Sequence, residues 1–103
     1  MSSSKLSRLG PPQAADAFNA EPVRARILLV DDVPANLLAL QAILEPLEQE
    51  VVLAHSGDEA LLQLLQKDFA CILMDVQMPG LTGLETAALI RSRERTRHIP
   101  LLF

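Results

Sequence analysis

The sequence predicts an α/β fold in which a parallel sheet carries helices on both faces. Short apolar runs alternate with longer segments whose apolar residues repeat at helical spacing, a pattern typical of strands joined by crossover helices. The apolar runs are continuous rather than alternating, which favours strands buried on both faces. With 103 residues, half of them apolar, the chain is long enough for one small domain with its own core.

The regular pattern begins at Arg26. Ile27–Val30 is predicted to form the first strand, and it ends in two aspartates. Pro34 fits the first turn of the following helix, where a missing N–H costs little. Pro46 and the charges after it predict the end of this helix. Its buried face should consist of leucines at helical spacing, namely Leu37, Leu40, Leu44 and Leu47.

The second and third strands are predicted at Glu50–His55 and Cys71–Met74. Between them, Ser56–Glu59 opens a helix with a polar cap followed by acids that favour a helix N-terminus. The buried face of this helix should contain Ala60, Leu61, Leu64 and Leu65.

Asp75 follows the third strand, and the loop Val76–Thr82 comes next. A third helix is predicted over Gly83–Glu94, and Ile99–Phe103 begins a fourth strand. The apolar positions of the third helix are Leu84, Ala87, Ala88 and Ile90.

Residues 1–25 lack this periodicity and are rich in Ser, Pro and Gly, which predicts a flexible tail or linker before a domain at residues 26–103. A net charge of −4 argues against a protein that binds nucleic acid through a basic face. The single cysteine, Cys71, cannot form an internal disulfide. With no apolar stretch long enough to cross a membrane and no signal peptide, we expect a cytoplasmic location.

Three aspartates follow two of the predicted strands: Asp31 and Asp32 after the first, and Asp75 after the third. Ligands of open α/β sheets bind at the carboxyl ends of the strands, where the strand order reverses. If these strands are neighbours, the three carboxylates converge and repel one another. A divalent cation such as Mg²⁺, which prefers oxygen ligands, would remove that repulsion.

Simpler interpretations exist for single residues. Asp32 could serve only as the cap of the first helix, and Gly57 and Gly80 could serve only in turns. His55 and His98 lack an acid or cysteine partner at metal-ligand spacing, which favours structural roles. The arginines are interpreted as a solvated helix end: Arg91, Arg93, Arg95 and Arg97.

The motifs Ile27–Asp32, Cys71–Gly80 and Thr82-Gly83 together resemble the receiver domain of bacterial response regulators, including receivers attached to hybrid histidine kinases. The resemblance covers about residues 26–103. It implies a flavodoxin-like, doubly wound parallel sheet of order 2-1-3-4-5 that is incomplete after the start of strand four.

The resemblance also implies a role for each site residue. Asp75 would be the phosphoacceptor and a metal ligand, Asp32 would bind Mg²⁺ or Mn²⁺ directly, and Asp31 would bind it mainly through water. The backbone carbonyl of Gln77 would supply a further ligand. Thr82 stands where the family usually has Asp or Asn, a change that we expect to do little harm because this side chain mostly orders the loop.

The family places a Thr or Ser after strand four and a Lys after strand five, and the sequence ends at Phe103, before both. We therefore expect a C-terminally truncated chain with weak metal binding, impaired phosphorylation and no switching. The apolar segment Ile99–Phe103 would be an open edge through which the fragment could associate with itself.

In this interpretation the chain is a phosphoacceptor in a two-component phosphorelay rather than an enzyme, although a parent hybrid histidine kinase remains open. Its partners would be a histidine kinase or phosphotransfer protein and an output domain or downstream effector. One alternative is a Mg²⁺-dependent phosphatase with an aspartyl-phosphate intermediate, disfavoured because Gln77 stands where such enzymes usually need a second acid. Another is a receiver-like interaction module that no longer signals by phosphate.

Overall fold

The computed structural model describes residues 25–103, so the predicted tail or linker lies outside the described residues except for Ala25. Four strands form one parallel sheet in the order β2-β1-β3-β4. This arrangement confirms the predicted α/β class and the first four positions of the predicted strand order. The strands are β1 Arg26–Val30, β2 Glu50–Ala54, β3 Cys71–Met74 and β4 Leu101–Leu102.

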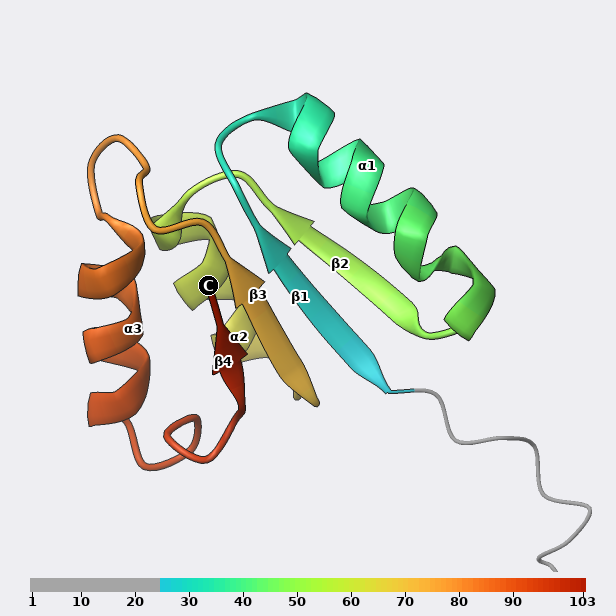
Figure 1. Cartoon of the computed structure of the whole chain (residues 1–103). Coiled ribbons are helices and arrows are strands. Elements are labelled where there is room, and N and C mark those ends of the chain that lie inside the picture. The colour runs from blue at the N-terminus through green and yellow to red at the C-terminus, as the bar shows by residue number, and fades with distance from the viewer. Residues whose placement is uncertain (1–24) are drawn as a thin grey trace, which may run out of the picture.

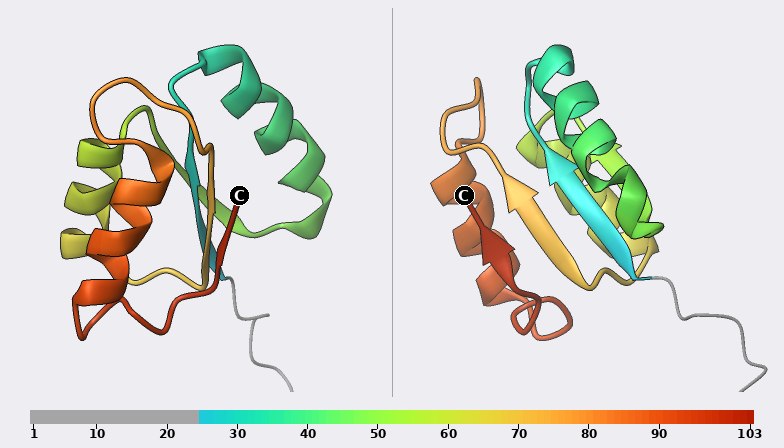
Figure 2. Two further views of the ribbon diagram at one scale, coloured as in Figure 1. Left: turned by 60° about the vertical axis from the view of Figure 1, so that its left-hand side comes forward. Right: turned by 45° about the vertical axis from the view of Figure 1, so that its right-hand side comes forward.

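Helices cover both faces of the sheet. Helix α1 (Pro34–Leu44), followed by the short 3-10 helix η1 (Glu45–Leu47), lies on one face. Helices α2 (Gly57–Gln66) and α3 (Gly83–Ser92) lie side by side on the other, as Figure 1 and Figure 2 show. No helix within residues 25–103 combines the length and apolar character that a membrane crossing needs.

The two faces of β1 build two separate hydrophobic clusters. Leu28 and Val30 point toward the side of α2 and α3, whereas Ile27 and Leu29 join Leu37 of α1 on the opposite side. Successive strand residues point to opposite faces, so a strand covered on both faces needs an unbroken apolar run. This packing explains the continuous apolar sequence from which β1 was predicted.

Two leucines predicted to be buried are exposed instead: Leu47 at 58% and Leu65 at 57%. Leu84, an apolar position of the third helix, is also exposed, at 61%. Leu47 leaves the expected face because α1 ends at Leu44 and the chain tightens into η1. Leu65 and Leu84 are each one residue from a buried position of their helix, a rotation of about 100° that turns the side chain outward.

The connection from α3 to β4 is held by side chains whose roles the sequence did not show. Helix α3 ends at Ser92 and not at Glu94, and the buried Thr96 donates from Oγ1 to the Ile90 carbonyl over 2.8 Å. Arg91 donates to the Arg97 and Ile99 carbonyls over 3.0 and 2.8 Å. The arginines are therefore more than a solvated helix end, because Arg91 shapes the chain reversal before β4.

The start of β4 also differs from the prediction. Pairing with β3 involves only Leu101 and Leu102, so the strand is shorter than the predicted segment Ile99–Phe103. In the described part of the chain, β4 pairs with β3 alone. Self-association through this edge stays a prediction.

Candidate metal centre

The register of the sheet brings the ends of β1 and β3 together. Val30 pairs with Met74, so the next residues on the two strands, Asp31 and Asp75, leave the sheet side by side. The backbone hydrogen bonds continue one residue beyond the strands: Asp75 N–H donates to the Val30 carbonyl over 2.9 Å, and Asp31 N–H donates to the Ala54 carbonyl over 3.1 Å. Both aspartates are thus fixed to the rigid carboxyl edge of the sheet.

Asp31, Asp32 and Asp75 form one carboxylate cluster. Each offers an oxygen, and these oxygens lie within 4.8 Å of one another. Asp31 is buried and the other two are half-buried. Three negative charges at this spacing repel, and they offer the hard oxygen ligands that Mg²⁺ and Mn²⁺ prefer. The arrangement could therefore hold a metal ion.

Asp31 differs from the other two because its carboxylate already has protein partners. Its Oδ1 accepts a hydrogen bond from the Val33 N–H over 2.9 Å, and its Oδ2 accepts one from Asn36 Nδ2 over 3.1 Å. The N-cap of α1 is Val33, which makes no side-chain cap, so the interpretation of Asp32 as the helix cap is wrong. Asp31, one residue earlier, organises the start of α1 instead.

Asp32 and Asp75 keep their carboxylate oxygens available. Within residues 25–103, no hydrogen bond or salt bridge reaches either carboxylate, since the hydrogen bonds of this region end on Asp31. Half-buried carboxylates are costly to leave without partners, and a cation would supply one. The donor set therefore fits a divalent cation held at this cluster.

The loop after β3 borders this cluster. Gln77 is exposed two residues beyond Asp75, and the role of its backbone carbonyl as a ligand stays a prediction. Met78 is buried in the core on the side of α2 and α3, and this packing anchors the loop to the core. Gly80 has a positive φ of 74°, a conformation that glycine adopts without strain, so its interpretation as a turn residue is confirmed.

Helix α3 begins beside this loop with a capping box that the sequence analysis missed. Thr82 Oγ1 accepts from the Glu85 N–H over 3.1 Å, and Glu85 Oε1 accepts from the Thr82 N–H over 2.9 Å. The pattern Thr-x-x-Glu before an apolar segment is the signal that could have revealed it. Thr82, the departure from the family pattern, therefore orders the junction of loop and helix.

An acid–base pair, His55 and Glu59, lies just after the end of β2. His55 Nδ1 is 3.2 Å from Glu59 Oε1, which also accepts from the His55 N–H over 2.8 Å. This hydrogen bond to the backbone, followed by the imidazole contact, lowers the pKa of Glu59. The expectation that His55 has no acid partner is wrong, because the first turn of α2 brings Glu59 back over it. Both side chains are more than half exposed, which favours a capping role.

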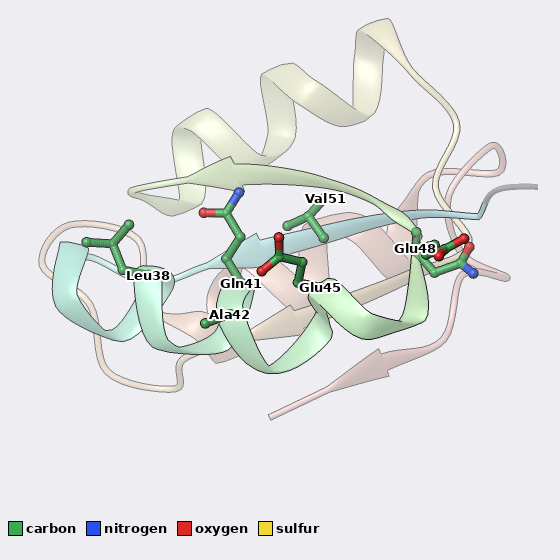
Figure 3. A pocket seen from close by; sticks show the side chains of 7 residues that line it. Leu38, Gln41, Ala42, Glu45, Glu48 and Val51 are labelled. Carbon is green, nitrogen blue, oxygen red and sulfur yellow. The ribbon is translucent and has the colours of Figure 1, made fainter.

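Cavities accompany these features in the described part of the chain. One of about 270 Å³ is bordered by Asp31 and Asp75 and is otherwise mostly apolar, including Leu40 and Phe103. Another, of about 480 Å³, lies between α1, η1 and Val51 of β2 (Figure 3). Its polar lining consists of glutamates and glutamines, namely Gln41, Glu45, Glu48 and Gln49.

The comparisons with known proteins agree with this geometry. Residues 27–103 match the model of the response regulator receiver domain. Sensor protein GacS of Pseudomonas syringae pv. syringae is 42% identical over 96 residues, a match that covers 90% of this chain and 11% of that protein. Histidine kinase BarA of Escherichia coli K12 is 38% identical over 76 residues, covering 74% of this chain and 8% of that kinase. The chain thus spans about a tenth of the length of these relatives.

Solved structures give the same result. The receiver domain of sensor histidine kinase PA1611 from Pseudomonas aeruginosa PAO1 superposes with a TM-score of 0.72 at 33% identity, covering 77% of this chain and 65% of that one. That structure contains a magnesium ion coordinated in its active site cleft. Chemotaxis protein CheY4 of Vibrio cholerae gives a TM-score of 0.73 at 30% identity, covering 77% and 66% of the two chains.

Proposed function

The chain belongs to the response regulator receiver domain family, and on that premise we propose that Asp75 is the residue that accepts the phosphoryl group. Its relatives include the receivers of hybrid sensor kinases, so a place in two-component signalling follows from the family. Receiver domains are signalling phosphoacceptors and generally not enzymes. The observation that carries the proposal is the carboxylate cluster, in which Asp75 stands at a strand end without a protein partner among the described residues.

The proposed reaction is a transfer of one phosphoryl group. A carboxylate oxygen of Asp75 attacks the phosphorus of a phosphohistidine, a new O–P bond forms, and the P–N bond breaks as the imidazole leaves. The product is an acyl phosphate on Asp75 that adds nearly two negative charges at neutral pH. The chain contributes mainly position, because the sheet edge holds the nucleophile in place before the donor arrives.

The residues around Asp75 fit a bound Mg²⁺ or Mn²⁺. Asp32 and Asp75 would hold the ion directly, Asp31 would bind it mainly through water as the family resemblance implies, and the Gln77 carbonyl would complete the protein ligands. When bound, the ion neutralises charge that builds up on the phosphoryl oxygens. The magnesium ion in the PA1611 receiver supports this part of the proposal.

The partners belong to the proposal as well. The phosphoryl donor would be a histidine kinase or a phosphotransfer protein, and the reader would be an output domain or a downstream effector. A cytoplasmic location is part of the same proposal and rests on the family. Because the chain spans about a tenth of the relatives' length, their sensing and kinase activities are not assigned to it.

The alternative functions are not favoured. An aspartyl-phosphate phosphatase usually needs a second acid two residues after the nucleophile, where this chain has Gln77. An interaction module that does not use phosphate would have no need for three acids converging at one sheet edge. Membership of the receiver family argues against the phosphatase.

Labelling by a small phosphodonor such as acetyl phosphate tests the proposed function. We expect the wild type to incorporate phosphate only when Mg²⁺ is present, and Asp75→Asn to incorporate none because an amide is a poor nucleophile. Glu59→Gln is a matched control that removes one exposed carboxylate from the same edge of the sheet and should keep its label. Incorporation that persists in Asp75→Asn would refute the assignment.

A further inference from the structure

The first residue of α3 lies directly against the backbone of the proposed phosphoacceptor. Gly83 is buried, and its N–H donates to the Val76 carbonyl over 2.8 Å. A Cβ on Gly83 would lie 2.1 Å from the Asp75 carbonyl oxygen and 2.8 Å from the Val76 Cα.

These contacts leave no room for a side chain. Carbon and oxygen atoms that are not bonded approach to about 3.2 Å, so a Cβ at Gly83 would force a displacement of about 1 Å. The obstructing atoms belong to the backbone, which cannot rotate away as a flexible side chain can. Either α3 must move outward, or the segment Asp75–Val76 must move toward the carboxylate cluster.

We propose that Gly83 is a positioning residue that sets the place of Asp75 relative to Asp31 and Asp32. The close approach seats α3 against the loop, and the hydrogen bond to Val76 fixes the start of the segment that leads to Gln77. The carboxylate of Asp75 and the carbonyl of Gln77 therefore keep their spacing through Gly83. This inference rests on the proposed function, because it concerns the geometry of that same site.

Gly57 supplies a matched control. It is also buried and also the first residue of a helix, α2, and a Cβ there would lie 2.2 Å from Thr86 Oγ1. The shortest approach is as tight as that of Gly83, but it meets the side-chain hydroxyl of Thr86 in α3. The next atom, Leu81 Cβ at 3.0 Å, lies in the loop before α3, and no atom of Asp75 or Val76 obstructs this position. Alanine at either position should destabilise the fold, and only alanine at position 83 should disturb the metal centre directly.

The test is Mn²⁺ binding by the wild type, Gly83→Ala and Gly57→Ala, with the free energy of unfolding measured for each. We expect Gly83→Ala to weaken Mn²⁺ binding about 10- to 100-fold, the range found when residues behind metal ligands are changed. Gly57→Ala should stay within about twofold of the wild type because its clash does not involve a ligand. Equal affinity in Gly83→Ala and the wild type, or an equal loss in Gly57→Ala, would overturn the inference.

A measurement on the wild type covers the case in which Gly83→Ala does not fold. The Gly83 N–H bonds to the Val76 carbonyl, whereas the Ala60 N–H makes a first-turn bond to Ser56 in α2. We expect Mg²⁺ with beryllofluoride to slow hydrogen exchange at the Gly83 amide more than at the Ala60 amide. Equal slowing at both amides would overturn the inference. Wild-type protein that binds no Mn²⁺ would instead refute the proposed function, and with it the role of Gly83.

Discussion

Asp31, Asp32 and Asp75 carry the same functional group, and their surroundings separate their roles. Asp31 is buried and accepts hydrogen bonds from Val33 and Asn36, so its charge helps to hold the start of α1. Asp32 and Asp75 have no such partners among residues 25–103. The first aspartate therefore stabilises the fold, whereas the other two contribute repulsion that a cation would relieve.

This division of roles predicts that substitutions of Asp31 and Asp32 affect stability differently. Asp32→Ala should abolish Mn²⁺ binding without lowering the free energy of unfolding of the metal-free protein, since it removes one of three clustered charges. Asp31→Ala removes the acceptor of two hydrogen bonds and should cost about 1–2 kcal/mol. Urea unfolding in the presence of a chelator, together with Mn²⁺ titration, measures both. Destabilisation of Asp32→Ala as large as that of Asp31→Ala would contradict the division.

The convergence of these aspartates could be predicted from the sequence, whereas their hydrogen bonds could not. Parallel strands end at a common edge, so acids that directly follow adjacent strands must come together. The bond between Asn36 and Asp31 depends on how α1 leaves the sheet, and no short motif encodes that angle. Gly83 was predicted only as the first residue of a helix and as part of the Thr82-Gly83 motif, because its close approach to Asp75 joins two elements through packing.

At the scale of the elements, two helix starts follow the same physical rule. Ser56 caps α2 by accepting from the Glu59 N–H over 3.1 Å, and Thr82 caps α3 by accepting from the Glu85 N–H over the same distance. Each satisfies a backbone N–H that the helix itself leaves without a partner. The cap of α2 was predicted from the sequence, whereas the cap of α3 was not, although an equally local pattern encodes it.

The cap of α3 predicts the effect of changing Thr82. Thr82→Ala should lower the free energy of unfolding by about 1 kcal/mol, because the Glu85 N–H loses its acceptor. Thr82→Asp restores an acceptor at the same position and should retain wild-type stability within about 0.5 kcal/mol. Thermal or urea unfolding of the two variants checks the pair. Equal stability of Thr82→Ala and the wild type would show that the capping box contributes nothing.

The His55–Glu59 pair at the start of α2 predicts that the stability of the fold depends on pH. The pKa of Glu59 is lowered by the His55 backbone N–H and then by its imidazole, so the charged form is favoured in the folded protein. Its contribution to stability is therefore present above the ordinary pKa of a glutamate and is lost as the pH falls through the lowered value. Because the pair is exposed, the effect should be less than about 1 kcal/mol.

Glu59→Gln tests this sign. At neutral pH the variant should be slightly less stable than the wild type. The difference should vanish in acid, where the Glu59 carboxyl of the wild type is protonated and therefore neutral like the glutamine of the variant. Unfolding free energies measured between pH 3 and pH 7 would show this convergence. A difference that stays constant over the whole range would exclude Glu59 ionisation as its cause.

At the scale of the whole molecule, the sequence predicted the sheet better than the helix faces. The continuous apolar run of β1 requires cover on both sides, and that requirement leads to the layered α/β fold. Helical spacing alone misplaced Leu47 and Leu65, because the turn at η1 and the docking of each helix decide which residues face the sheet. The alternation of strands and helices determined the topology, whereas the exposed surface depended on tertiary packing.

The whole molecule is thus a scaffold that brings two strand ends to one point, with α3 seated behind them. The proposed function requires that Asp75, and no other residue, carries the phosphoryl group. The most direct test treats the protein with acetyl phosphate and Mg²⁺, reduces the acyl phosphate with borohydride, and locates the resulting homoserine by peptide mass spectrometry. We predict homoserine at position 75 only, and none when Mg²⁺ is removed by a chelator. Homoserine at position 31 or 32, or equal modification without Mg²⁺, would contradict the account.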